Sequence, residues 1–427
     1  MMVALLFAIF LFLIFINVPI SIALGVSSLL FIVITDMIPL KMIPQQMFAA
    51  LDSFPLMAAP FFILAGKLME HGGISNRLID FAQALVGRLK GGLAHVGIVT
   101  CMFFAALSGS GSATTAAVGS ILIPYMVKKG YDRSFASAVP AAAGTTGIVI
   151  PPSVPLILYG VTAGVSVSSL FIAGIVPGMM IGLSLMLVSY IVSVVKGYEG
   201  SSNESGGISQ LAVSFKRAFL SLLMPVIILG GIYGGIFTPT EASVVAVVYG
   251  FILGFFVYRQ INFKVLREIL VSSVVTTSVI LLLIATASLF GMILTRQNVP
   301  QSIGTAILES PLSPLLVILI INIFLLIVGT FMETIASVII LTPILLPVVT
   351  AMGMDPIHFG IIMIANLSIG LITPPVGINL FVGAQVGGVS YEKIVRAMLP
   401  FLLMMIVDIF IITFIPHLSL FLVDILQ

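Results

Sequence analysis

The chain has 427 residues, of which 60% are hydrophobic and only 7% are charged, and its mean hydropathy is +1.30. A soluble protein of this length could not cover its surface with so few charges, and the net charge of +2 gives no basis for binding nucleic acid. A spanning helix needs about 20 apolar residues, so the composition predicts an all-α, polytopic protein in the lipid bilayer with roughly ten to twelve membrane segments.

Apolar segments of the first half are separated by short polar breaks. In chain order they cover residues 3–16, 20–35, 46–70, 92–127, 134–164 and 168–195. Two of them are interrupted internally. The small residues 107–112 divide 92–127, which predicts a re-entrant hairpin, and the double proline Pro151-Pro152 divides 134–164, which predicts a broken helix.

A polar stretch at 197–215 follows and is predicted to be a cytoplasmic linker. It divides the chain into a first unit at 1–196 and a second at 216–427. The apolar segments of the second half are 217–236, 241–258, 268–294, 312–350, 357–388 and 398–416. Here 312–350 is the predicted hairpin and 357–388 the predicted broken helix, while Glu241 is expected to cap the helix that starts at Pro239.

The two halves are copies of one another. Adding 223 to a residue number superimposes glycines and prolines of the first half on those of the second without a gap. Chance would give roughly one such coincidence over this stretch, so eight coincidences indicate a repeat. The pairs are Pro124/Pro347, Gly130/Gly353, Gly147/Gly370, Pro151/Pro374, Pro152/Pro375, Gly160/Gly383, Gly164/Gly387 and Pro177/Pro400.

Loop charges predict that the copies have opposite orientations. Lys128 and Lys129 follow the first hairpin, whereas the equivalent positions of the second copy are uncharged, and Lys393 has no basic equivalent in the first copy. Since cytoplasmic loops concentrate Lys and Arg, the basic loops change sides between the copies. The resulting topology places both chain ends in the periplasm. Arg296 is the one basic residue that it leaves clearly on the periplasmic side.

Hairpin tips and double prolines are where binding chemistry is expected. Each double proline frees backbone carbonyls about one turn upstream, and free carbonyls beside hydroxyls suit a hard cation such as sodium. Half-helix N-termini offer N–H groups that suit a carboxylate. Matched breaks in the two halves of a membrane protein therefore predict ion and substrate sites around one cavity.

Catalytic motifs do not compete with this interpretation. The sequence contains no G-x-S-x-G elbow, no H-E-x-x-H and no Walker A loop, so we expect a transporter and not an enzyme. Glu333 is the best candidate for an acid within the membrane, although a position at the aqueous boundary explains it equally well.

Four short runs then resemble a known family. They are Leu107-Ser108-Gly109-Ser110, Ile150-Pro151-Pro152-Ser153, Phe237-Thr238-Pro239-Thr240-Glu241-Ala242 and Gly370-Leu371-Ile372-Thr373-Pro374-Pro375. Over essentially the whole chain, the sequence resembles the large membrane subunit of the tripartite ATP-independent periplasmic (TRAP) transporters. The resemblance implies a sodium-driven importer of organic acids in the bacterial inner membrane, with an elevator mechanism. It also implies a periplasmic substrate-binding protein and a separate, small four-helix membrane subunit as partners.

The repeat and the resemblance together indicate the binding residues. The first sodium site would comprise Ser108, Ser110, Gly147, Ile150 and Pro152. The second sodium site would comprise Gly329, Thr330, Gly370, Thr373 and Val376. Substrate would contact Ser112, Thr145, Thr146, Glu333, Asn366 and Ser368.

Substrate identity and two rival functions stay open. Many family members have an acidic residue just after the Ser-Gly-Ser run, where this chain has Ser112-Ala113-Thr114. This difference leans towards a sialic-acid-type substrate over a C4-dicarboxylate. The first rival is a sodium–dicarboxylate symporter that needs no binding protein. The second is an intramembrane enzyme, which would need a catalytic acid such as Glu333.

Overall fold

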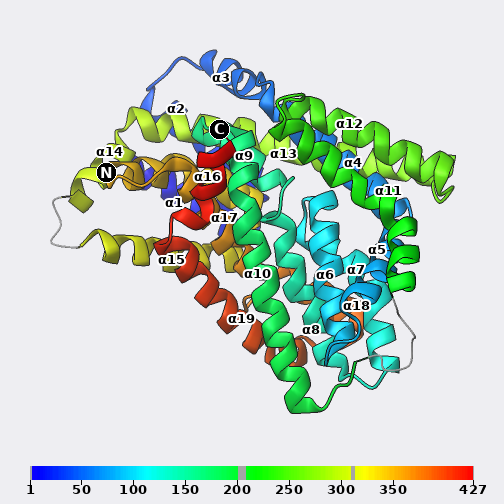
Figure 1. The fold of residues 1–427 in the computed structure, drawn as a ribbon. Helices are drawn as coiled ribbons and strands as arrows, with labels where there is room; N and C mark the ends of the chain where they lie inside the picture. Colours follow the sequence, from blue (N-terminus) through cyan, green and yellow to red (C-terminus); the bar gives the residue numbers. More distant parts are fainter. Residues whose placement is uncertain (1, 201–207, 309–312, 427) are drawn as a thin grey trace.

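The computed structural model describes residues 2–200, 208–308 and 313–426, and regular structure in these ranges is helical. Seven of the described helices are long and apolar enough to cross a membrane, or eight if the bent pair α3 and α4 counts as one span. Shorter apolar helices pair across breaks and hairpin tips. The chain is therefore a polytopic, all-α membrane protein, as its composition predicts (Figure 1).

Six helical elements precede the first hairpin, which is followed by the first broken helix and a long span. The first group is α1 (Met2–Phe15), α2 (Ile20–Thr35), α3 (Met42–Leu51), η1 (Pro55–Met57), α4 (Ala58–His71) and α5 (Ile74–Val86). The hairpin is α6 (Gly92–Ser108) with α7 (Gly111–Lys128). The broken helix and the span are α8 (Arg133–Ala143), η2 (Gly144–Ile148), α9 (Val154–Ala163) and α10 (Val167–Lys196).

The second half has the same order. Its first group is α11 (Ile208–Tyr233), α12 (Pro239–Phe251), the π-helical turn η3 (Ile252–Val257), α13 (Phe263–Arg296) and α14 (Val299–Leu308). The second hairpin is α15 (Pro314–Phe331) with α16 (Thr334–Ala351). The second broken helix and the final helices are α17 (Pro356–Gly370), α18 (Ile378–Gly387), α19 (Tyr391–Phe414) and α20 (His417–Leu426).

The helix boundaries follow the sequence repeat. Adding 223 places both ends of α7 on the two ends of α16, and it places the start of α8 on the start of α17. Both double prolines contain a cis peptide bond. The contacts are exchanged between the copies, because α16 packs against α9 while α7 packs against α18. Two inverted-topology repeats therefore interlock, each hairpin lying against the helix that follows the other copy's double proline.

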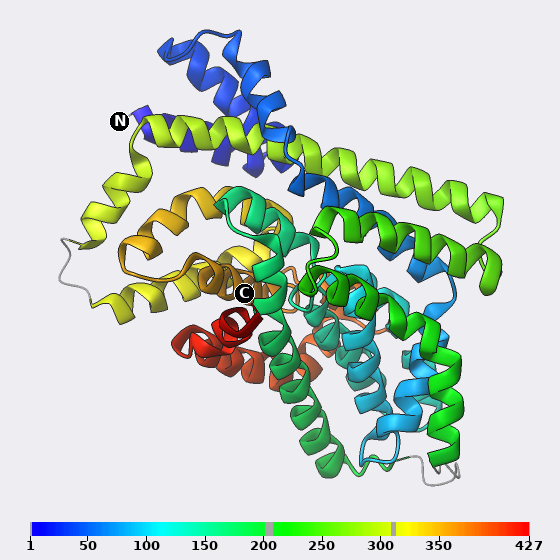
Figure 2. The same ribbon diagram turned by 45° about the horizontal axis from the view of Figure 1, so that its top comes forward.

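The first helices of each copy form a scaffold beside the hairpins. Helix α12 packs against α4, and the equivalent pair α2 and α13 also packs together. Figure 2 shows α13 as a long helix along one edge of the molecule, and α13 also contacts α3 and α4. These helices provide a surface against which the hairpins and broken helices lie.

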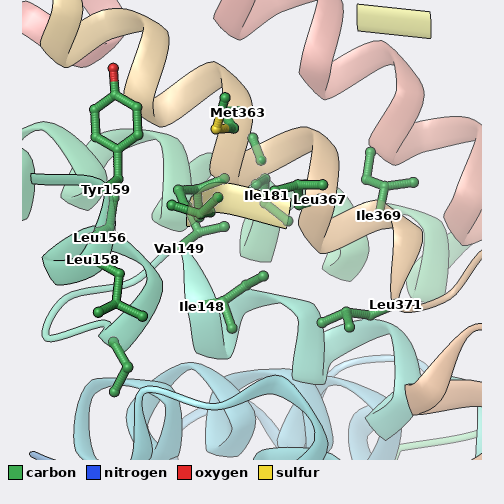
Figure 3. Packing of buried hydrophobic residues seen from close by; sticks show 14 of the residues in the cluster. Ile148, Val149, Leu156, Leu158, Tyr159, Ile181, Met363, Leu367, Ile369 and Leu371 are labelled. Carbon is green, nitrogen blue, oxygen red and sulfur yellow. The ribbon is translucent and has the colours of Figure 1, made fainter. Parts of the chain in front are cut away.

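The two broken helices share one core. Ile148 and Val149 lie at the first break, and Leu367, Ile369 and Leu371 lie at the second. Figure 3 shows these five side chains in a single packed cluster of buried hydrophobic residues. Since a buried core transmits strain, we expect movement of one break to affect the other.

Several element boundaries differ from the sequence-based expectation. Helix α11 begins at Ile208, inside the predicted linker, and 201–207 of that linker lie outside the described residues, as does the start of the predicted hairpin at 312. The predicted span 46–70 is two helices that meet at 66° around Pro55. Helix α20, which follows Pro416, was not predicted at all. The unit boundaries themselves stay a prediction.

Candidate functional site

A cavity of about 190 Å³ lies between the two hairpin tips and the scaffold. One wall consists of the first tip, 108–113, and the second tip, 333–335. The scaffold wall is formed by α4 and α13, and residues flanking both double prolines complete the lining. We call this space the inner cavity. It lies at the meeting point that the matched breaks predict.

Hydroxyl groups and glycine give the first tip its shape. Gly109 ends α6 with a positive φ of 59°, a conformation in which a side chain would be strained. The Ser110 side chain accepts a hydrogen bond from Ala113 N and so caps α7. The Thr114 hydroxyl donates to the Ser110 carbonyl at 2.7 Å and lies 2.9 Å from the Ser108 hydroxyl. Three neutral oxygens are thereby gathered at one turn.

The first break lies directly against this tip. A Cβ added to Gly147 would lie 2.6 Å from the Ser110 carbonyl oxygen, and one added to Gly109 would lie 3.0 Å from the Pro152 carbonyl oxygen. The structure therefore brings Ser108, Ser110, Gly147 and Pro152 together. Ile150 belongs to the same break, but its side chain packs against Gly178 of α10. Any contribution of Ile150 to an ion site would come from its backbone.

The second tip meets the second break even more closely. A Cβ added to Gly370 would overlap the Gly329 carbonyl group, so only glycine permits this approach. The Thr330 hydroxyl donates to Ile327 O and the Thr373 hydroxyl to Ile369 O, both at 2.7 Å. Gly329 and Thr330 of the tip thus meet Gly370 of the break, and the place of the Thr373 hydroxyl in the same site stays a prediction.

The structure gives less support for Val376, the fifth residue predicted for this second site, than for the glycines of that site. Its side chain is 37% exposed, and its carbonyl accepts a hydrogen bond from the Tyr391 hydroxyl at 3.0 Å. Because a carbonyl has two lone pairs, this oxygen keeps one acceptor position. Its assignment as a ligand stays a prediction.

The chemistry of both tips fits a hard monovalent cation. The hydroxyls that donate to helix carbonyls keep lone pairs on their oxygens, and sodium at broken helices is typically bound by such neutral oxygens. Across the described residues, no cluster of His, Cys, Asp and Glu could hold a metal ion. The donors that the two tips offer are hydroxyl and carbonyl oxygens, with the Glu333 carboxylate in addition at the second tip.

The residues predicted to contact substrate fall into two groups. Ser112 and Glu333 line the inner cavity. The Glu333 carboxylate accepts hydrogen bonds from Ile335 N at 2.9 Å and Ala336 N at 3.2 Å, so it caps α16 and is held at the tip. A carboxylate fixed in this way faces the cavity with little freedom to rearrange.

The second group does not reach the cavity. Thr145, Thr146, Asn366 and Ser368 are fully buried, and each side chain donates to a carbonyl of its own segment. None of the four lines the inner cavity. A role for them in binding substrate stays a prediction, and their hydrogen bonds indicate that they stabilise the broken helices.

Charged residues of the scaffold complete the cavity and were not predicted. Lys67 and Glu70 of α4 line it, and the Lys67 ammonium donates to the Ser272 hydroxyl and, at 3.5 Å, to the Thr276 hydroxyl of α13. Charged residues within an apolar segment are functional candidates, and this signal could have identified both. The cavity thus combines one cation with two acids, Glu70 and Glu333.

A buried amide pair connects the second hairpin to its broken helix. Asn366 Nδ2 donates to Asn322 Oδ1 at 2.7 Å, and the Thr413 hydroxyl reaches the same oxygen at 3.2 Å.

We expect Asn322→Ala to destabilise the protein by about 1–3 kcal/mol, because buried donors would lose their acceptor. Thermal unfolding of the purified protein measures this. Asn76→Ala, on the exposed face of α5, should change stability by less than about 0.5 kcal/mol, and equal effects would contradict the role of the pair.

Comparisons with known proteins agree with this architecture. The family model described as "Tripartite ATP-independent periplasmic transporter, DctM component" matches residues 7–418. The Alcanivorax borkumensis YdaH transporter, a crystal structure described as having an unusual topology, has the same fold with a TM-score of 0.60 at 14% identity, covering 85% of this chain and 84% of that one.

Curated relatives are closer in sequence. The isethionate TRAP transporter permease protein DctMQ of Oleidesulfovibrio alaskensis is 45% identical over 97% of this chain, which spans 65% of that relative's length. The C4-dicarboxylate TRAP transporter large permease protein DctM of Pseudomonas aeruginosa is 46% identical over 93% of each chain. The sialic acid TRAP transporter large permease protein SiaM of Vibrio cholerae is 38% identical over 96% of each chain. This chain therefore belongs to the family of DctM components, the large permease proteins of tripartite ATP-independent periplasmic transporters.

Proposed function

We propose that this chain imports a small organic anion across the bacterial inner membrane, driven by sodium. The observation that supports this most directly is the convergence of two hairpin tips and two broken helices on one cavity. The first tip and the second break offer neutral oxygens for cations, and the cavity between them contains the Lys67 ammonium together with the carboxyl groups of Glu70 and Glu333. A binding arrangement for an anion and its coupling ions follows.

Sodium is proposed at the two tips. Ser108, Ser110 and Gly147 would hold one ion, and Gly329, Gly370 and Thr373 another. Each charge that moves through 100 mV is worth about 2.3 kcal/mol, so two ions entering with a monoanion leave one net charge driven inward by the membrane potential. The sodium concentration gradient adds to this driving force. Accumulation of the anion against its own gradient then needs no ATP site on this chain.

The proposed substrate is a carboxylate or a sulfonate. The relatives are named for isethionate, C4-dicarboxylates and sialic acid, which all bear an anionic oxygen group. The Lys67 ammonium would pair with such a group, while Glu70 and Glu333 in the same cavity would favour the accompanying sodium ions. Ser112 and the other first-tip hydroxyls would bind the remaining polar atoms of the substrate.

An elevator-type movement is the proposed mechanism. The inner cavity has one wall on the hairpins and the other on α4 and α13. The hairpins and broken helices pack against one another across the two copies, which supports their movement together as a transport domain against the scaffold. The proposed partners are a periplasmic substrate-binding protein and a small four-helix membrane subunit on a separate chain. In this arrangement both chain ends lie in the periplasm.

Uptake by proteoliposomes tests the proposal and separates it from its rivals. The membrane complex is reconstituted, and accumulation of isethionate, C4-dicarboxylates and sialic acid is measured with and without a sodium gradient and a binding protein. We expect accumulation of one acid class that requires both. Uptake without any binding protein would favour the independent symporter, and absence of gradient-driven uptake for every acid would contradict the proposal.

The enzyme alternative has its own test. An intramembrane enzyme would need the Glu333 carboxyl group for chemistry, whereas a transporter would need an acceptor at this position to cap α16 and to contact the substrate. Glutamine keeps an acceptor oxygen for the cap, so we expect Glu333→Gln to retain substantial uptake. Full uptake by this variant argues against a catalytic role for Glu333.

A further inference from the structure

Arg296 is the last residue of α13, and the predicted membrane topology does not explain a positive charge at this position. The helix has 34 residues, with Lys264 and Arg267 near its start and Arg296 at its last position. At a rise of 1.5 Å per residue, the two ends are about 50 Å apart, so Arg296 lies at the opposite membrane face from these two residues. The bias of cytoplasmic loops towards basic residues therefore does not account for it.

A second cavity, of about 460 Å³, reaches this arginine. Its scaffold wall consists of the C-terminal part of α13 with residues of α3, and its other wall consists of the end of α9 and the middle of α16. We call this space the outer cavity. Its polar side chains are Gln46, Thr162, Ser288, Thr295 and Arg296.

The outer cavity has a single charge. Among the described residues that line it, Arg296 is charged and the other polar groups are neutral amides and hydroxyls. Gln46 Nε2 donates to the Ser288 hydroxyl at 3.0 Å, which connects the two scaffold helices at this wall. A concave site with one sign of charge raises the local concentration of the opposite ion, here an anion.

The inner and outer cavities follow one another along the same three helices, α9, α13 and α16. On α13, Ile280 lines the inner cavity and Ile284 the outer one, one helical turn or about 6 Å further on. On α16, Ile335 lines the inner cavity and Ile339 the outer one. Ile280, Ile284 and Ile339 are no more than 8% exposed, so buried apolar side chains separate the two spaces.

We propose that the outer cavity is an access site for the transported anion, in which Arg296 binds its carboxylate or sulfonate group before the anion passes Ile280, Ile284 and Ile339. The inference rests on the proposed function as an organic-anion importer. A guanidinium group pairs with two carboxylate oxygens at once, which favours Arg over a neutral residue at such a position. The hydroxyls of Thr162 and Ser288 lie on opposite walls and offer further hydrogen bonds.

Thiol labelling tests the outer cavity without depending on transport. The natural cysteine, Cys101, is fully buried, and a Cβ at Gly291 would meet only Pro343 Cγ at 4.0 Å, so Gly291→Cys places an accessible thiol in the cavity. In the reconstituted complex, an anionic sulfonate methanethiosulfonate should label it faster than a cationic trimethylammonium one. We expect Arg296→Gln to lower this preference about tenfold and Arg296→Lys to keep it.

Arg267→Gln, at the other end of α13, is the matched control and should leave the labelling preference unchanged. In uptake assays, Arg296→Gln should raise KM about tenfold with little change in kcat, since an access site affects capture. An unchanged labelling preference in Arg296→Gln, or an unchanged KM, would overturn the proposal and leave Arg296 as a helix-end anchor. Failure of the proposed function is distinguishable, because it would appear as absent uptake by the unmodified protein.

Discussion

Gly370→Ala is expected to abolish uptake. The added Cβ would overlap the Gly329 carbonyl group, so the second hairpin tip would have to move away from its broken helix. Overpacking of this kind typically costs about 1–3 kcal/mol of stability, and displacement of binding groups by an ångström can lower a rate about 100-fold. Initial uptake rates in proteoliposomes measure the effect. Quantification of the folded, inserted protein distinguishes lost transport from lost expression.

A glycine-to-alanine substitution at a position with free space around it provides the control. Gly230 lies within α11, and a Cβ there would meet nothing within 4 Å, so Gly230→Ala should transport normally. Gly147 is the repeat equivalent of Gly370 and lies against the Ser110 carbonyl, so Gly147→Ala should impair uptake as well. Normal uptake by Gly370→Ala would show that the close contact of tip and break is not required for transport.

Thr373→Ala is expected to raise the sodium concentration for half-maximal uptake about tenfold. We expect the loss of one oxygen ligand to weaken sodium binding by about 1.4 kcal/mol, which corresponds to a tenfold lower affinity. The Thr373 hydroxyl also donates to Ile369 O, so Thr373→Ser, which keeps the hydroxyl, should restore the original dependence. Uptake is measured across a sodium titration at fixed substrate concentration.

A control for this prediction comes from a hydroxyl with the same local bond. The Thr350 hydroxyl donates to Leu346 O at 2.8 Å on an exposed part of α16, far along the helix from the tip. Thr350→Ala should leave the sodium dependence unchanged. If Thr373→Ala gave the same titration curve as the unmodified protein, the second sodium site would not include this hydroxyl.

Much of the architecture could be predicted from the sequence because glycine and proline mark breaks by their own chemistry. Gly147 and Gly370 are small enough for a hairpin tip to approach, and both double prolines end helices. The capping role of Glu241 is also confirmed, since Thr238 and Glu241 form a capping box at the start of α12. Local rules of this kind depend on neighbours in the chain and are therefore readable from it.

What depends on tertiary packing could not be predicted. The direction of a hydroxyl is set by its rotamer, so the sequence does not show that Thr145 and Thr146 donate within their own segment; their role in binding substrate stays a prediction. Lys67 reaches the inner cavity only because α4 crosses α13 there, and the sequence does not contain that crossing. Helix α20 was not predicted because the ten residues after Pro416 are too few to signal a span.

Coupled flux of radioactive sodium shows whether the anion and sodium, bound around one cavity, cross the membrane together. Proteoliposomes that contain the complete transporter receive radioactive sodium and a transported acid at equal sodium concentrations on both sides, with an inward gradient of the acid. We expect the acid to drive sodium uptake, and Gly370→Ala to abolish this uptake. Accumulation of the acid with no accompanying sodium flux would contradict coupled transport.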